Sequence, residues 1–126
     1  MDQNTLVVGG QALVKALDAA GFRPRIAMWV HNTDTDAWKL WLVPPKKHAD
    51  KPDFYRRVAK IVSQHRAEFA GIDTSDTEMV LDTHPAMKGI GGYVKIPDLG
   101  SVHFTGNRFN GYYLPDGIIL RSDLQT

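Results

Sequence analysis

A run of oxygen-bearing side chains, HNTDTD, begins at His31 and separates two strongly apolar segments. Three of its residues match the first ligand positions of a calcium-binding loop, and these are Asn32, Asp34 and Asp36. The rest of that loop is missing, because Ala37 stands where the turn needs glycine and Val43 where a bidentate acid is needed. Asn and Asp side chains also bond to their own loop backbone. We therefore predict a hairpin loop and no cofactor here, with a metal site as the alternative.

A His-x-Thr tripeptide at residues 31–33 is repeated at residues 103–105. Over these six residues the chain resembles the two-histidine phosphoesterases, which carry paired His-x-Thr or His-x-Ser motifs. The resemblance implies that His31 and His103 act as general base and acid on an RNA-type phosphodiester, and that Thr33 and Thr105 hold the phosphate oxygens. Imidazole suits that task because it titrates near neutral pH. The chain departs from the family pattern after the first threonine, where an acidic pair stands in place of an apolar residue and would repel a phosphate.

Cationic side chains are concentrated between residues 46 and 66, where seven Lys or Arg accompany two Asp. Nucleic-acid binding requires such cations to share one surface. Helical spacing allows this for four of them, Lys46, Lys47, Arg56 and Lys60. This predicts a phosphate-contacting patch, with an ordinary solvated helix face as the alternative.

The composition predicts one domain covering residues 1–126, since 43% of the 126 residues are apolar. The near balance of 15 basic and 14 acidic residues excludes a strongly basic field over the whole molecule. The absence of cysteine excludes disulfides, thiolate catalysis and cysteine-containing zinc sites. No signal peptide or membrane-spanning run is visible, so we expect a cytoplasmic protein without a membrane partner.

The spacing of apolar residues predicts the helices and strands that position these residues. Apolar residues at helical spacing predict an N-terminal helix that ends at Gly21, with Phe22 folding back. Its start is left open: either the helix begins only at Gln11, or the glycine pair at residues 9 and 10 lets another backbone approach closely. Asp50 predicts the start of a second helix that ends at Gly71, with His65 at the centre of its core-facing stripe. Residues 25–30 and 38–43 predict an antiparallel hairpin.

Beyond residue 78 the chain alternates short apolar segments with Pro-Asp, Gly-Asn and Asn-Gly turns, which predicts a meander of antiparallel strands. Residues 83–92 are expected to hold one helical turn, started by Pro85, within a loop. The predicted fold class is therefore α+β: a mainly antiparallel sheet, made of the N-terminal hairpin and the C-terminal meander, with two helices packed on it.

The hairpin also suggests a function. If Val30 lies opposite Trp38, then alternate residues of both strands face the helices, and the other face carries Ala27, Trp29, Trp41 and Val43. Apolar residues on the outer face of a one-sided sheet need cover, either internally from the Tyr-rich C-terminal strands, from a ligand, or from another molecule at an association surface. The sequence thus favours a non-catalytic protein-interaction module, as a homo-oligomer or an accessory subunit. A nucleic-acid-directed protein, either a binder or the phosphodiesterase, is the alternative.

Overall fold

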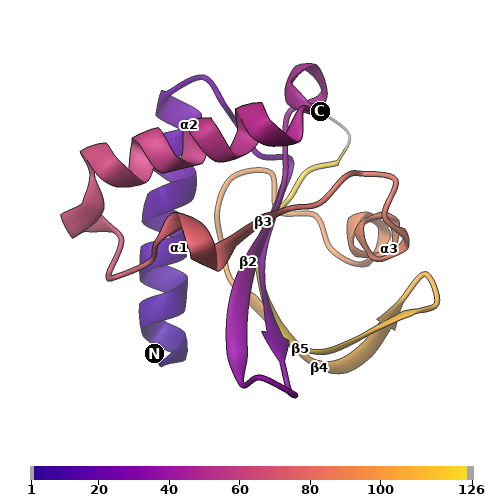
Figure 1. Ribbon diagram of the computed structural model, residues 1–126. Helices are drawn as coiled ribbons and strands as arrows, with labels where there is room; N and C mark the ends of the chain where they lie inside the picture. The colour runs from indigo at the N-terminus through magenta and orange to yellow at the C-terminus, as the bar shows by residue number, and fades with distance from the viewer. Residues whose placement is uncertain (1, 125–126) are drawn as a thin grey trace.

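A five-stranded mixed sheet forms the centre of the computed structural model, which describes residues 2–124 (Figure 1). Its order is β3-β2-β1-β5-β4, and all neighbours are antiparallel except β2 and β3. The strands are β1 (Ile26–Asn32), β2 (Ala37–Val43), β3 (Thr77–Met79), β4 (Val102–Phe109) and β5 (Tyr112–Ser122). The predicted α+β class is confirmed.

Helices cover both faces of the sheet. One face packs against α1 (Gln3–Ala19) and α2 (Lys51–Gln64), and the other against α3 (Pro85–Tyr93), which Figure 1 shows on the opposite side of the strands. Short 3-10 turns lie at η1 (Lys46–His48), η2 (Arg66–Glu68) and η3 (Thr74–Asp76). None of the helices in the described part of the chain is long and apolar enough to cross a membrane.

The first helix begins earlier than expected. Asp2 caps it by accepting a 2.7 Å hydrogen bond from the Thr5 backbone N–H. At its other end Gly21 adopts a φ of 77° and the Phe22 N–H bonds to the Leu17 carbonyl, which confirms the predicted C-terminal motif. The helix therefore runs through the glycine pair at residues 9 and 10, whose lack of side chains permits close packing.

The predicted strand register is wrong by one residue. Val30 lies opposite Lys39 rather than Trp38, because the hairpin loop consists of the four residues 33–36. A slip of one residue moves one strand's side chains to the other face relative to its partner. Trp29 therefore packs with Leu40 under α1 and α2, whereas Trp41 lies on the face that α3 covers.

This register corrects the predicted association surface. Ala27, Trp29 and Val43 are each 0–1% exposed and belong to the interior of the chain. They are also divided between the two faces, since Ala27 and Trp29 pack in the cluster beside α1 and Val43 packs in the cluster beside α3. Only Trp41 retains partial exposure, so the four residues cannot form one contact patch.

The second helix begins as predicted and ends sooner. Asp50 accepts a hydrogen bond from the Asp53 N–H at 3.0 Å, but the helix stops at Gln64. The expectation that His65 lies in the core is wrong: the residue is exposed, and its Nδ1 lies 2.8 Å from a carboxylate oxygen of Glu68. Because the helix ends at Gln64, helical spacing does not place His65 on the core-facing stripe.

The C-terminal meander is partly as predicted. Strands β4 and β5 form a hairpin across Asn110 and Gly111, whose φ values of 53° and 83° are typical of a type I′ turn. The short strand β3, by contrast, runs parallel to β2, and the segment around Ile96 contributes only a single bridge to Ser122. The expected helical turn is the nine-residue helix α3, which His84 caps through its ring nitrogen.

Candidate functional site

The two His-x-Thr motifs begin on strands that are not neighbours in the sheet. His31 on β1 is paired with Asp116 on β5, and Asp116 in turn with Thr105 on β4. Neighbouring strands are about 4.8 Å apart, so roughly 10 Å separates the strands that carry the two histidines. The His31 Nε2 lies 2.8 Å from Asp36 Oδ1, and no contact between His31 and His103 is present in the described chain.

The oxygen-bearing run spans the end of β1 and the whole loop of the β1–β2 hairpin, where a hairpin loop was predicted. The side-chain oxygen of Asn32 accepts hydrogen bonds from the backbone N–H groups of Asp34, at 2.9 Å, and Thr35, at 3.3 Å. The Asp36 carboxylate is occupied by His31. Within residues 2–124 no group of three or more His, Cys, Asp or Glu could hold a metal ion. Two of the three side chains that suggested a metal site, Asn32 and Asp36, thus stabilise the turn.

The residues of the predicted cationic patch come from two elements. Lys46 and Lys47 lie in η1, whereas Arg56 and Lys60 lie on the exposed side of α2. The charge on α2 is partly neutralised, because the Asp53 carboxylate accepts hydrogen bonds at 2.8 Å from Arg57 and from Arg56. The hydrogen bond from Arg57, followed by that from Arg56, holds the pKa of Asp53 below its ordinary value. The η1 lysines instead border a pocket that is described further below.

A groove lined by aromatic side chains lies on the α3 side of the sheet. It comprises two cavities of about 350 and 340 Å³ that have Trp41, Glu78 and Tyr112 in common. The ring centroids of Trp41 and His84 are 5.5 Å apart at 64°, and those of His84 and Tyr112 are 4.7 Å apart at 66°. We call this site, defined by Trp41, Glu78, Leu81, His84 and Tyr112, the aromatic groove.

Several separate elements position the aromatic groove. Trp41 on β2 lies directly opposite Glu78 on β3, so both side chains project from the same face. His84 is held at the start of α3 by the backbone N–H of Ala86, at 3.1 Å. Tyr112 begins β5 immediately after the Asn-Gly turn and is 41% exposed.

The aromatic groove carries one carboxylate without a partner. Glu78 is exposed, and among the described residues its carboxylate takes part in no hydrogen bond or ion pair. The ammonium group of Lys39, which borders one of the cavities, donates to the Ser75 carbonyl. The cavity that Lys39 does not border therefore combines the rings of Trp41, His84 and Tyr112 with the Glu78 carboxylate, which suits a cation.

Sequence reasoning identified only Trp41 of this site. Glu78, Leu81, His84 and Tyr112 were missed because parallel pairing of β2 with β3 and the return of β5 beside β1 bring them together. The available signal was weak: His84 precedes a proline, and Tyr112 follows an Asn-Gly turn. A helix start before the proline and a turn at Asn-Gly explain both residues without any functional role.

Comparisons with protein-family models, with curated proteins and with solved structures gave no match. The functional proposal therefore depends on the geometry of the chain itself.

Proposed function

We propose that this protein is a non-catalytic protein-interaction module that receives a Lys or Arg side chain of a partner protein in the aromatic groove. The observation that carries the proposal is the unpartnered Glu78 carboxylate beside the rings of Trp41, His84 and Tyr112. Aromatic faces attract cations, and the attraction is worth about 0.5–2 kcal/mol depending on desolvation. A carboxylate at the same place adds charge complementarity, which selects the sign of the partner residue.

The exposure of neighbouring side chains supports a protein partner. Leu81 is 43% exposed and Tyr112 41% exposed, and Tyr113 beside them is 53% exposed. Partly exposed tyrosines and tryptophans are enriched at protein contacts, where one end of the side chain is apolar and the other polar. The proposal keeps the interaction role inferred from the sequence and transfers it from the predicted hairpin face to the groove around Trp41.

Titration of the ¹⁵N-labelled chain with two capped tripeptides, Ac-Ala-Lys-Ala-NH₂ and Ac-Ala-Glu-Ala-NH₂, tests the proposal by NMR. We expect the lysine peptide to shift the indole N–H of Trp41 and the amide of Glu78 with a dissociation constant of about 1–10 mM, since a single contact of this kind is weak. Trp41→Ala and Glu78→Gln should each weaken binding about three-fold or more.

Tyr93→Ala is the matched control, because Tyr93 is an aromatic residue 50% exposed at the end of α3 and does not line the groove. This variant should bind as the native chain does. An equal response to the glutamate peptide, or unchanged binding by Glu78→Gln, would contradict the proposal. The solution mass should be measured in parallel, because a dimer that Trp41→Glu dissociates would identify the partner as a second copy of the chain.

A further inference from the structure

A pocket of about 500 Å³ lies where the loop before β1, the turn after β2 and the end of β5 meet. It is lined by Arg23, Arg25, Pro45, Lys46, Lys47 and Asp123, and we call it the basic pocket. Its lining residues are separate from those of the aromatic groove. The volume is within the range of sites that hold small organic ligands.

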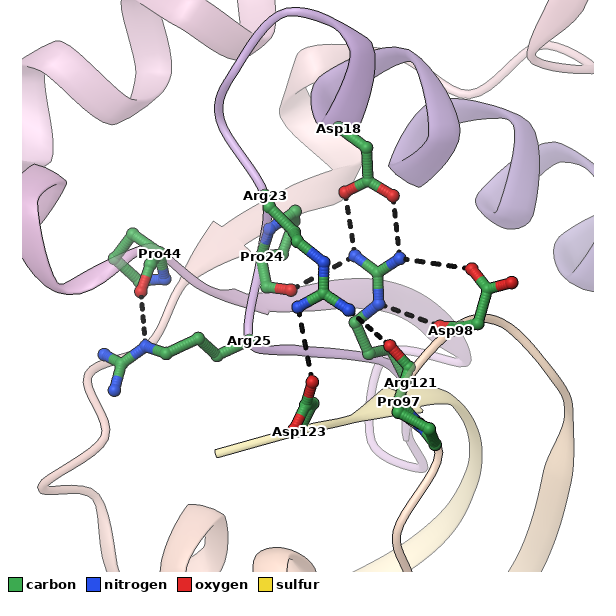
Figure 2. A network of polar contacts seen from close by, with 9 residues as sticks. All are labelled: Asp18, Arg23, Pro24, Arg25, Pro44, Pro97, Asp98, Arg121 and Asp123. Atoms are coloured by element: carbon green, nitrogen blue, oxygen red, sulfur yellow. Dashed lines mark hydrogen bonds and ion pairs between the residues drawn. The ribbon is translucent and has the colours of Figure 1, made fainter. Parts of the chain in front are cut away.

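Buried hydrogen bonds hold the surroundings of the basic pocket in place (Figure 2). Arg121 is 1% exposed and binds both carboxylate oxygens of Asp18, at 2.8 and 2.7 Å. The same guanidinium donates to the backbone carbonyls of Pro24 and Asp98, at 3.2 and 2.8 Å. Arg121 thereby joins the end of α1, the loop that carries Arg23 and the segment before β4. A site fixed in this way needs little reorganisation when a ligand binds.

Arg25 is the buried cation of the basic pocket, with 6% of its surface exposed. Its Nε donates to the Pro44 carbonyl and its Nη1 to Asp82 Oδ2, both at 3.0 Å. In the described part of the chain Nη2 has no hydrogen-bond partner. The guanidinium is thus fixed by two of its nitrogens, and the third retains N–H groups that can donate to an anionic oxygen.

The charge of the basic pocket indicates the ligand. Lys46 and Lys47 are exposed and, within residues 2–124, unpaired, whereas Arg23 lies 3.4 Å from an Asp123 oxygen and also donates to the Pro97 carbonyl. The Asp82 and Asp123 carboxylates therefore leave an excess of about two positive charges, which a phosphomonoester of charge −1.5 to −2 at neutral pH would neutralise. Pro45 and the methylene groups of the cationic side chains provide apolar walls for an organic substituent.

From this arrangement we propose that the basic pocket binds the phosphomonoester group of a small organic molecule. Nη2 of Arg25 donates to a phosphoryl oxygen, and Lys46 and Lys47 supply charge at the entrance. The site is independent of the proposed interaction through the aromatic groove.

Isothermal titration of the native chain with phenyl phosphate, inorganic phosphate and benzoate tests this inference. We expect phenyl phosphate to bind more tightly than inorganic phosphate, because only the ester uses the apolar walls, and about ten-fold more tightly than benzoate, because of its larger charge. Lys46→Ala and Lys47→Ala should each weaken binding of phenyl phosphate about three-fold or more, and added salt should weaken it further.

Lys60→Ala is the matched control, because Lys60 is an exposed lysine of α2 outside the pocket, and Trp41→Ala is the control for the aromatic groove. Both should bind phenyl phosphate as the native chain does. Absence of binding at 10 mM phenyl phosphate, or equal affinity for benzoate, would overturn the proposal. Tighter binding of a twelve-nucleotide single strand that Lys60→Ala weakens would replace it with an extended nucleic-acid surface.

Discussion

The contact between Gly10 and Trp29 shows how one missing side chain determines local packing. The indole Nε1 of Trp29 donates to the Leu6 carbonyl at 2.8 Å, alongside the position that a Cβ atom at residue 10 would occupy. Such an atom would lie 2.7 Å from Nε1 and 2.8 Å from a methyl carbon of Leu120. The glycine therefore allows the helix to approach the sheet closely enough for this hydrogen bond to form.

Gly10→Ala should destabilise the protein, although alanine ordinarily stabilises a helix by about 1 kcal/mol relative to glycine. We expect the free energy of unfolding to fall by about 1–3 kcal/mol, because the added methyl group must displace Trp29 or Leu120. Urea denaturation followed by circular dichroism measures the change.

Gly92→Ala is the comparison for this prediction, since residue 92 lies in α3 and a Cβ there would meet no atom within 4 Å. It should leave the free energy of unfolding unchanged or raise it by up to about 1 kcal/mol. If Gly10→Ala were as stable as Gly92→Ala, the Trp29 ring would not lie against α1.

At the scale of single elements, the sequence predicted which segments form secondary structure better than which way they face. Local signals mark most of the element ends. Capping and proline residues mark the helix starts at Asp50 and Pro85, a left-handed glycine marks the helix end at Gly21, and turn residues mark the β1–β2 hairpin. The orientation of the hairpin carries no such signal, because β1 is apolar on both faces and α3 covers the second one. Polar alternation, which normally distinguishes the faces, is therefore absent.

The start of α2 predicts an acid-dependent loss of stability. The pKa of Asp53 is held below its ordinary value mainly by the hydrogen bond from Arg57, and it is lower in the folded than in the unfolded chain. Such a carboxylate stabilises the fold fully at every pH above its pKa in the unfolded chain, which is about 4. This contribution is lost as the pH falls through the pKa that the group has in the folded chain. Native protein should therefore lose stability below about pH 4 more steeply than Asp53→Asn does.

Thermal unfolding of the two proteins between pH 2 and pH 6 measures this difference, which added salt should reduce because the pairs are exposed. If the two proteins gave parallel curves of melting temperature against pH over the whole range, the Asp53 ion pairs would not contribute to the stability of the fold.

For the whole molecule, the Asp18–Arg121 pair connects positions 103 residues apart in the chain. Removing one member of a buried ion pair leaves the other charge without compensation, which typically costs 3–5 kcal/mol. Because the Asp18 side chain is 27% exposed, we expect a smaller loss, of about 2–4 kcal/mol, for Asp18→Asn. Urea denaturation gives the value, and a loss of less than about 0.5 kcal/mol would mean that water replaces the carboxylate.

The arrangement of the whole sheet could not be predicted from local patterns. The α+β class followed from alternating helical and strand-like segments, but the order β3-β2-β1-β5-β4 depends on β1 pairing with a strand near the other end of the chain. The candidate sites share this difficulty. Glu78, His84 and Tyr112 are each unremarkable in their own segments, and Arg25 and Lys46 are brought to one pocket by the ends of different strands.

The central place of β1 has a consequence for the order in which the protein is made. The strand is translated before its neighbour β5, which begins roughly eighty residues later in the chain, and this separation corresponds to about 4–16 s of translation. Throughout that interval β1 lacks the strand that will pair with it, and until α3 is made the apolar side chains on one of its faces also lack the helix that will cover them. We therefore expect the nascent chain, rather than the finished protein, to be the species that most needs protection from aggregation.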